Sequence, residues 1–343
     1  MSFPRALVLF SFAALAIAGP LSTAAEAQSV SCPGRNLLDD IKAKDASAFA
    51  RIKAAAVANK NGSTVLWKIE NEEKPDRPAS YLFATLGVSD LRLQALSPAV
   101  SSAMNAASRI ALEVDETTNA RTQEAVGTMT NALLPDGGTN PKLESLLAKP
   151  EASRANLMLV KSGLSQDLVP RAKPWVAMLA ASTSDCERER LKQGKLTLDA
   201  ELARLAESRG VGSFGLESTE MKLGAFAELS DAEQLSLLKA TLAGFDRIDD
   251  QTETLVQLYL AHDIGAIWPL LEELTKRHGA DATALESYRK HVLDERNTRM
   301  RDRMLMHLAT GNVFVAVGAM HLPGDNGIVE LLREAGYTLT ALE

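Results

Sequence analysis

VFVAVGAMHLPG, residues 313–324, is the stretch that decides the fold of this 343-residue chain. Its first five residues are all apolar, which is typical of a strand buried on both faces and therefore of a parallel or mixed sheet. Gly318 allows the backbone to turn tightly after the strand, and Pro323-Gly324 fixes the end of the loop. His321 is thereby placed beyond the carboxyl end of a central strand, where ligands bind in open α/β sheets.

Five other segments are rich in β-forming residues, and apolar residues with helical spacing lie between them. Strands joined by helices favour a parallel or mixed sheet, so the order predicts the α/β (mixed α+β) class with a central mixed sheet. The expected strands are 64–70, 81–86, 109–114, 211–216, 313–317 and 337–342, and the expected helices are 36–60, 97–107, 327–335 and those within 230–308.

A long helical segment separates two of these strands. From about 117 to 207 the pattern is mostly helical and is interrupted by prolines. We find no internal repeat, no low-complexity tract and no clear linker. Residues 28–343 are therefore expected to form a single domain with a large helical insertion at about 117–207.

The first 27 residues have the pattern of a secretory signal peptide. Arg5 precedes an uncharged run at 6–19, Pro20 ends that run, and Ala25-Glu26-Ala27 has the small-x-small form of a cleavage site. The run is too short to span a bilayer as a helix, which also disfavours a retained signal anchor. We expect an exported protein, periplasmic or secreted, with no transmembrane helix after cleavage.

The chain has two cysteines, Cys32 and Cys186, and neither belongs to a CxxC motif. In an exported protein the simplest interpretation is one disulfide that joins the N-terminal segment to the body. It would close a long loop and contribute about 4 kcal/mol in the chain-entropy model. A catalytic thiol is the alternative, but no local motif supports it.

Composition excludes one class of partner. The formal charge is −7 and only 5% of residues are aromatic. A phosphate backbone is bound by clustered positive charge, and single-stranded bases are bound by stacked aromatic side chains. The sequence therefore predicts no nucleic-acid partner.

Polar residues gather where the predicted strands end. Glu113 lies in an otherwise apolar strand, so its carboxylate needs a cation or hydrogen-bond donors, and a structural ion pair is the alternative to a site. Glu217 ends the next strand and could equally be solvated. His321 could be a metal ligand or a base, or a histidine held by a loop carbonyl.

A predicted helix at the end of the 230–308 segment offers partners for these groups. Asn297 falls in an apolar stripe with Leu293, Met300 and Met304, so its amide must find a buried hydrogen-bond partner. Arg296 could clamp a carboxylate of Glu113 or of a substrate. We expect Glu113, Glu217, Arg296 and Asn297 to be the catalytic residues.

These motifs together resemble the TraB/GumN (TIKI-related) family over nearly all of the mature chain, and the Gly-x-x-His-Leu-Pro-Gly segment is the most specific part. The resemblance implies an EreA/ChaN-like mixed sheet with a helical insertion. It also implies similarity to metal-dependent proteases, with His321 and the strand residue Glu113 as metal ligands, and Glu217 is our candidate for a further metal ligand or a base. The segments that carry it are Leu66–Ile69, Tyr81–Phe83, Leu112-Glu113, Glu217, Glu295–Asn297, Val317–Gly324 and Gly336-Tyr337.

The sequence departs from the family at its first motif. Where the family has Gly-Thr-x-His, this chain has Ala84-Thr85-Leu86-Gly87, so Gly87 stands at the histidine position. Catalytic zinc sites use three protein ligands, and here Glu217 or Asp90 would have to supply the third. We therefore predict that a divalent metal binds weakly or not at all.

Two functions of different classes follow from these residues. The first is a metal-dependent hydrolase of peptide or ester bonds with an impaired metal site, in which Glu113 and His321 hold the metal. The second is a non-catalytic binding protein, a pseudoenzyme that uses the same crevice for a small molecule, a peptide or a glycan. Gly87 favours the second function, whereas the presence of Glu113, Glu217, Asn297 and His321 favours the first.

Overall fold

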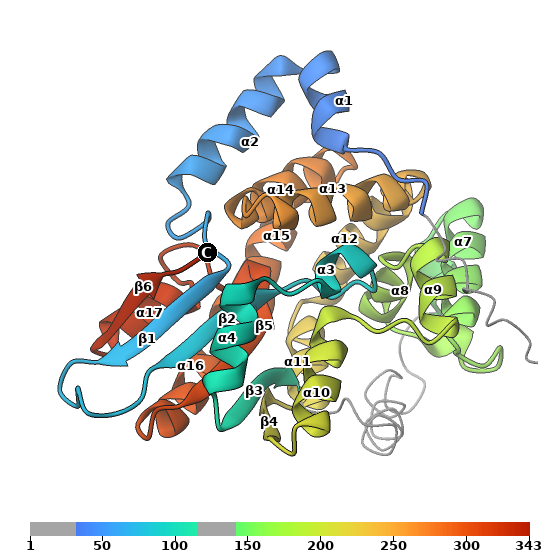
Figure 1. Ribbon diagram of the computed structural model, residues 1–343. Helices are drawn as coiled ribbons and strands as arrows, with labels where there is room; N and C mark the ends of the chain where they lie inside the picture. The colour runs from blue at the N-terminus through green and yellow to red at the C-terminus, as the bar shows by residue number, and fades with distance from the viewer. Residues whose placement is uncertain (1–31, 115–141) are drawn as a thin grey trace, which may run out of the picture.

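The computed structural model describes residues 32–114 and 142–343, and its centre is a mixed β-sheet (Figure 1). The predicted signal peptide and the start of the predicted insertion lie outside these ranges. Within them six strands form the sheet in the order β4-β3-β5-β2-β1-β6. The predicted fold class is confirmed. The strands are β1 Leu66–Asn71, β2 Ser80–Thr85, β3 Arg109–Val114, β4 Gly212–Glu217, β5 Val313–Gly318 and β6 Tyr337–Ala341.

The sheet is parallel over four strands and antiparallel at one edge. β3 pairs in parallel with β4 and β5, and β5 pairs in parallel with β2. β1 runs antiparallel to both β2 and β6. β5 lies inside the parallel part, which explains its apolar run, because residues 313–317 are all buried. The carboxyl ends of β2, β3, β4 and β5 therefore lie along one edge of the sheet.

The N-terminal helical segment differs from the single helix expected over 36–60. It forms two helices, α1 (Leu37–Lys44) and α2 (Ala46–Ala58). Asp45 leaves the helical conformation between them, and its side chain accepts a hydrogen bond from the amide of Ala48. Aspartate is a favoured N-cap residue, so this side chain starts a new helix although the apolar pattern continues across it.

Helices cover the sheet and extend beyond it to one side. α4 (Pro98–Ala106) packs on β2, α16 (Glu295–Leu308) packs on β4 and α17 (Ile328–Glu334) packs on β6. Figure 1 shows α7, α8 and α9 at the side of the molecule away from β6. The other described α-helices are α3 Leu91–Gln94, α6 Leu143–Leu146, α7 Lys149–Lys161, α8 Pro174–Ala181, α9 Asp185–Lys192, α10 Leu198–Ser208, α11 Thr219–Ala227, α12 Asp231–Gly244, α13 Ile248–Leu260, α14 Ile267–Arg277 and α15 Ala282–Tyr288.

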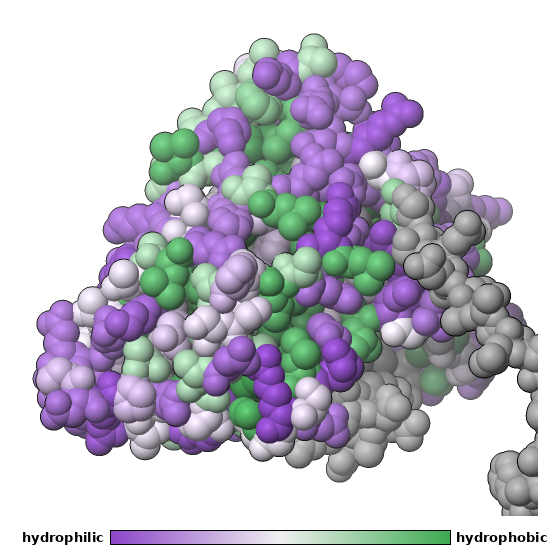
Figure 2. Space-filling model, viewed as in Figure 1, coloured by the Kyte–Doolittle hydropathy of each residue, from purple (hydrophilic) through white to green (hydrophobic). Residues whose placement is uncertain are grey.

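The described residues form two hydrophobic cores. One lies around the sheet and includes Phe314 and Leu112. The other lies among the helices and includes Trp175, Met158 and Leu238. On the face in Figure 2, hydrophilic residues predominate over β1 and β6, and apolar residues are more frequent around α3 and α10. The helices thus have their own packed interior beside the sheet.

Cys32 and Cys186 form the predicted disulfide, with their Cα atoms 5.6 Å apart. It joins the N-terminal segment to α9 across 154 residues of sequence. Across residues 32–114 and 142–343, no helix combines the length and the apolar character that a bilayer span requires.

Candidate functional site

A cavity of about 490 Å³, here called the site cavity, opens at the carboxyl ends of the parallel strands. The ends of β2, β3 and β5 contribute Thr85, Glu113 and Gly318 to its wall. Helices close the other sides, and Arg296 and Lys222 reach in from two of them. Its position agrees with the rule that open α/β sheets bind ligands beyond the carboxyl ends of their strands.

Arg296 joins the two strand-end glutamates. Its Nε donates to both carboxylate oxygens of Glu217, at 3.0 and 3.2 Å, and its Nη2 also contacts that carboxylate. The same Nη2 donates to Glu113 Oε1 at 2.6 Å. Arg296 and Glu217 are each 3% exposed. Buried charges of this kind need such pairing, because an isolated one is very costly.

Glu113 also binds a second cation, which sequence reasoning missed. Lys222 Nζ lies 2.7 Å from Glu113 Oε1, and the amide of Gly318 donates to Glu113 Oε2 at 3.0 Å. Burial by itself would raise the pKa of Glu113, but Lys222, and after it His321 and Arg296, hold that pKa well below its usual value. Two carboxylates are thus balanced by two cations.

The position of Lys222 follows from the junction between β4 and α11. Ser218 follows the last strand residue and caps the helix by accepting a hydrogen bond from the amide of Met221. Lys222 is four residues beyond Ser218, one turn into the helix, so it faces back toward the strand ends. The only signal in the sequence is this strand-cap-helix spacing, which does not by itself single out a lysine.

His321 is held by Asn297 in a defined orientation. Asn297 Oδ1 lies 2.6 Å from His321 Nδ1, and Asn297 Nδ2 donates to the carbonyl of Asn326 at 2.8 Å. Since the amide nitrogen of Asn297 is already a donor, its oxygen requires a proton on Nδ1 and leaves the lone pair on Nε2. Burial lowers the pKa of His321 to about 3, so the ring is neutral at pH 7.

A π-helical segment precedes the helix that carries these partners. Residues Arg289–Asp294 are π-helical and lead directly into α16. Arg296 Nη1 donates to the carbonyl of Val292 in that segment, at 3.1 Å. π-Helical turns shift the register of a helix and occur often at functional sites. Here the turn immediately precedes the two side chains that hold the glutamates and the imidazole.

The predicted residues meet in pairs rather than as one ligand set. His321 Nε2 lies 3.9 Å from Glu113 Oε2, and both face the site cavity. Among the described residues, two groups bring three ligand-type atoms within 4.8 Å of one another, and Glu113, Glu217 and His321 are not one of them. Those two groups are Glu228–His291–Glu295 and Cys32–Cys186–Asp249, the second of which contains the disulfide.

These donors fit a divalent metal only in part. An imidazole held by an amide through its other nitrogen is the usual arrangement of a ligating histidine, and Glu113 adds a carboxylate oxygen. The oxygens of Glu217, however, are engaged by Arg296. A catalytic zinc site has three protein ligands, and the described residues supply two at this position.

The position of Gly87, where the family resemblance leads us to expect a histidine, adjoins open space. Gly87 lines the site cavity, and a Cβ atom built there would meet nothing within 4 Å. Asp90, considered above as a substitute ligand, does not line this cavity. It accepts hydrogen bonds from Arg92 and Arg190, and these neighbours hold its pKa at about 2 against the effect of burial. Of the two candidates for a third ligand, Asp90 is therefore engaged by arginines outside this cavity.

Asp199 is a second acid in the cavity that sequence reasoning missed. It lies at the start of α10 and accepts a hydrogen bond from Thr85 Oγ1 at 2.7 Å. Burial, and then the negative charge of Glu113, raise the pKa of Asp199. No motif marks this residue in the sequence, because its approach to the strand ends depends on how α10 packs.

Comparisons with known proteins agree with this architecture. The TraB/PrgY/gumN family matches residues 65–341, which include all six described strands and every site residue named above. The chain belongs to the TraB/PrgY/gumN family. The match includes the segment around Gly87, where the sequence resemblance leads us to expect a histidine.

The curated relatives of this family member are named metalloproteases. Metalloprotease TIKI1 of Danio rerio is 27% identical over 189 residues, which is 49% of this chain and 38% of the relative. Metalloprotease TIKI2 of Danio rerio is 25% identical over an alignment of 347 positions that covers 86% of this chain and 64% of the relative. The chain thus spans less than two thirds of the length of these relatives. No solved structure matches the chain.

Proposed function

We propose that this protein is an exported hydrolase of peptide or ester bonds whose metal site is reduced to two ligands, Glu113 and His321. The observation that carries the proposal is the neutral imidazole of His321, held by Asn297, with its Nε2 lone pair facing the site cavity 3.9 Å from Glu113. The named metalloproteases among its relatives support the reaction class.

The chain's own residues have separate tasks in this proposal. Asn297 fixes the tautomer and orientation of His321, and Arg296 holds Glu113 and Glu217 in place. A divalent cation at Glu113 and His321 would polarise a substrate carbonyl and lower the pKa of a water. Lys222 adds positive charge where negative charge develops during attack on a carbonyl. The sequence prediction that Glu217 is a ligand or base is kept as an alternative to its task as partner of Arg296.

The reduced ligand set predicts weak activity. The space at Gly87 lies in the cavity wall where the family has its first histidine. Even changes in residues that only support ligands typically cost 10–100-fold in metal affinity or activity, and losing a ligand should cost at least that. We therefore infer that hydrolysis is impaired in the unmodified protein.

Export is part of the proposal. The N-terminal 27 residues have the pattern of a signal peptide, and the disulfide between Cys32 and Cys186 is of the kind that persists in oxidising compartments.

A binding protein without catalysis is the second proposal, and Lys222 is the observation that favours it. Its ammonium contacts Oε1 of Glu113, the oxygen that also accepts from Arg296, so the two glutamates are neutralised without a metal. In this case the site cavity would hold a small molecule, a peptide or a glycan fragment and leave it intact.

A hydrolysis screen separates the two proposals. The purified protein is assayed on libraries of peptides and carboxylic esters with added Zn²⁺, Mn²⁺ or Co²⁺, beside His321→Ala and Gly87→His. We expect weak activity that His321→Ala abolishes and Gly87→His raises. Binding of library members without turnover, in the unmodified protein and in Gly87→His alike, would reject the hydrolase in favour of the binding protein.

A further inference from the structure

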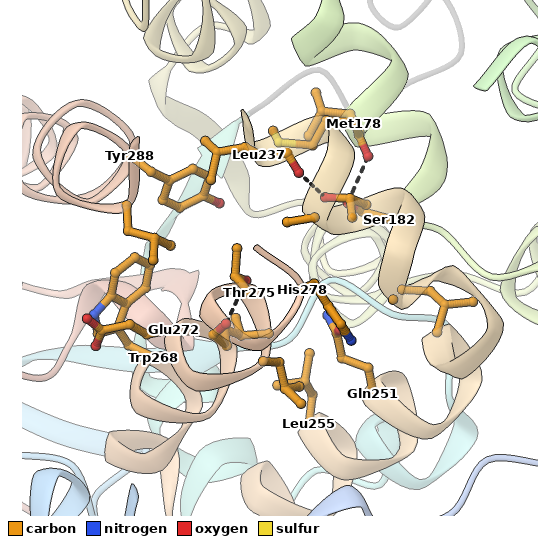
Figure 3. Close-up of a pocket in the computed structure, with 18 residues that line it drawn as sticks. Met178, Ser182, Leu237, Gln251, Leu255, Trp268, Glu272, Thr275, His278 and Tyr288 are labelled. Carbon is orange, nitrogen blue, oxygen red and sulfur yellow. Dashed lines mark hydrogen bonds between the residues drawn. The ribbon is translucent and has the colours of Figure 1, made fainter. Parts of the chain in front are cut away.

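A second cavity lies among the helices beside the site cavity. It has a volume of about 290 Å³ and is enclosed by α8, α12, α13, α14 and α15 (Figure 3). We call it the aromatic pocket, after Trp268 and Tyr288, which lie together on one side of it. None of the residues discussed for the proposed reaction lines it, so it needs an explanation of its own.

The two cavities share a wall. Leu255, Leu271 and Tyr288 line both the site cavity and the aromatic pocket. The ring of Tyr288 stacks on Trp268 in the pocket, with ring centroids 5.9 Å apart and an interplanar angle of 19°. Its other neighbour, Phe226, lines the site cavity and meets Tyr288 edge-on with centroids 5.9 Å apart. A group bound in the pocket would therefore lie next to the site cavity.

The pocket offers an apolar surface despite its polar residues. Ser182, Thr241 and Thr275 each donate their hydroxyl to a carbonyl of their own helix, at 2.8, 2.9 and 2.6 Å. Figure 3 shows the bonds of Ser182 and Thr275 directed to the helix backbone. Satisfied in this way, hydroxyls add no unpaired donor to the pocket, and methyl and methylene groups contribute much of the wall.

Charge in the pocket is also neutralised. Glu272 is paired with Lys276 at 2.8 Å. Burial lowers the pKa of His278, so its imidazole is neutral at pH 7. The described residues that line the pocket include no lysine or arginine. An anionic ligand group would find no cationic partner among these residues, whereas an uncharged apolar group would lose only water.

The volume selects the size of that group. A dry apolar cavity of about 150 Å³ is enough to bind benzene. A space of 290 Å³ therefore accepts one aromatic side chain together with part of its backbone. Stacked rings at one side favour a flat aromatic group, because aromatic pairs gain energy beyond their buried area.

We propose that the aromatic pocket is the specificity subsite of the hydrolase, and that it takes the aromatic side chain of a peptide or amino-acid ester whose scissile bond lies in the site cavity. This inference rests on the proposed function for the bond that is cleaved. The recognition of the aromatic group rests on the pocket alone and can be measured without turnover.

The test compares a substitution that fills the pocket with a matched substitution on the surface. Ala240 lines the pocket and is 1% exposed, whereas Ala243 lies on the exposed side of the same helix, α12. Ala240→Phe places a ring in the pocket, and Ala243→Phe adds the same ring to the surface. Thr241→Leu is a smaller filling variant, and thermal unfolding of all three checks that they fold.

Binding is measured with N-acetyl-phenylalaninamide and N-acetyl-alaninamide by calorimetry. We expect the phenylalanine compound to bind the unmodified protein at least tenfold more tightly, because a buried ring gains transfer free energy. Ala240→Phe and Thr241→Leu should reduce this preference, and Ala243→Phe should keep it. Ligand-dependent tryptophan emission should disappear in Trp268→Phe. Equal binding of both compounds, or an unchanged preference in folded Ala240→Phe, would overturn the subsite.

His321→Ala distinguishes failure of the subsite from failure of the proposed function. That variant should keep the phenylalanine preference, since His321 does not line the aromatic pocket. A phenylalanine preference that is lost in Ala240→Phe, without hydrolysis of any aromatic substrate, would support binding of an aromatic group in the pocket and reject the hydrolase. Hydrolysis with no preference for aromatic substrates would leave the hydrolase and remove the subsite.

Discussion

The loops that follow β2 and β5 differ in what they place at the same edge of the sheet. The two strands are hydrogen-bonded neighbours, with Thr85 opposite Gly318. The β5 loop carries His321, which is 4% exposed and bonded to Asn297. The β2 loop carries Gly87, beside which a side chain would meet nothing within 4 Å. The position of His321 is thus tightly packed, whereas the position of Gly87 adjoins open space.

Because of this difference, one part of the site contributes mainly to folding stability and the other mainly to ligand binding. On the β5 side, Glu113, Glu217 and Arg296 form a buried network in which the loss of one charge leaves others unpaired. On the β2 side no packing constrains the residue at Gly87. A change in the first region should therefore affect folding, whereas a change in the second should affect ligand binding and leave folding intact.

The largest expected effect is that of breaking the buried network. Arg296→Met leaves Glu217 without its partner and Glu113 with Lys222 alone, so we expect a loss of about 3–5 kcal/mol in the free energy of unfolding. Urea denaturation measures it. Arg303→Met, an exposed change on the same helix, should stay within about 0.5 kcal/mol. A loss below about 1 kcal/mol in Arg296→Met would show that the network is not held by this residue.

A smaller loss in the free energy of unfolding is expected when the pH is lowered. The folded protein holds the pKa of His321 at about 3, below its ordinary value of 6.5, so the unfolded chain takes up this proton first as the pH falls. Stability linked to His321 is therefore complete above pH 6.5 and is lost between pH 6.5 and 3. The depressed pKa of Glu113 adds a loss below its ordinary value of 4.5.

His321→Asn isolates the histidine part of that loss. The charged neighbours Glu113, Arg296 and Lys222 remain in the variant, so only the imidazole proton is removed. Urea denaturation from pH 7 to pH 4 should show a steeper fall in the unmodified protein than in His321→Asn. Parallel curves would mean that the buried imidazole is not kept neutral by the fold.

The smallest effects compare the two glycines directly. A Cβ at Gly318 would lie 3.1 Å from Glu113 Oε2 and 3.4 Å from His321 Cδ2, so Gly318→Ala should cost about 1–3 kcal/mol. Gly87→Ala should cost less than about 0.5 kcal/mol, because the space is open. Thermal unfolding compares them. An equal cost at both positions would remove the contrast between the two loops.

Much of the fold was predictable because each strand carries its own signal. The apolar run at 313–317 indicated a strand buried on both faces, and β5 is one. The helix expected over 36–60 was wrong because the apolar spacing continues through Asp45, whose side chain starts a second helix. The π-helical turn before Glu295 could not be read, since the apolar spacing of the segment does not reveal a one-residue shift in its hydrogen bonding.

The site was predictable where strands deliver residues and not where helices do. Glu113, Glu217 and His321 come from strand ends, and parallel pairing brings such ends to one edge. Lys222 and Asp199 reach the same cavity from α11 and α10. Their approach depends on how these helices pack against the sheet edge, which local sequence patterns do not determine.

Metal affinity tests the central claim most directly. The unmodified protein and Gly87→His, both freed of metal, are titrated with Zn²⁺ by calorimetry, with His321→Ala as control. We expect weak or undetectable binding in the unmodified protein and at least tenfold tighter binding in Gly87→His, which His321→Ala abolishes in the combined variant. Tight, stoichiometric zinc in the unmodified protein that His321→Ala removes would contradict the claim that its site has only two ligands.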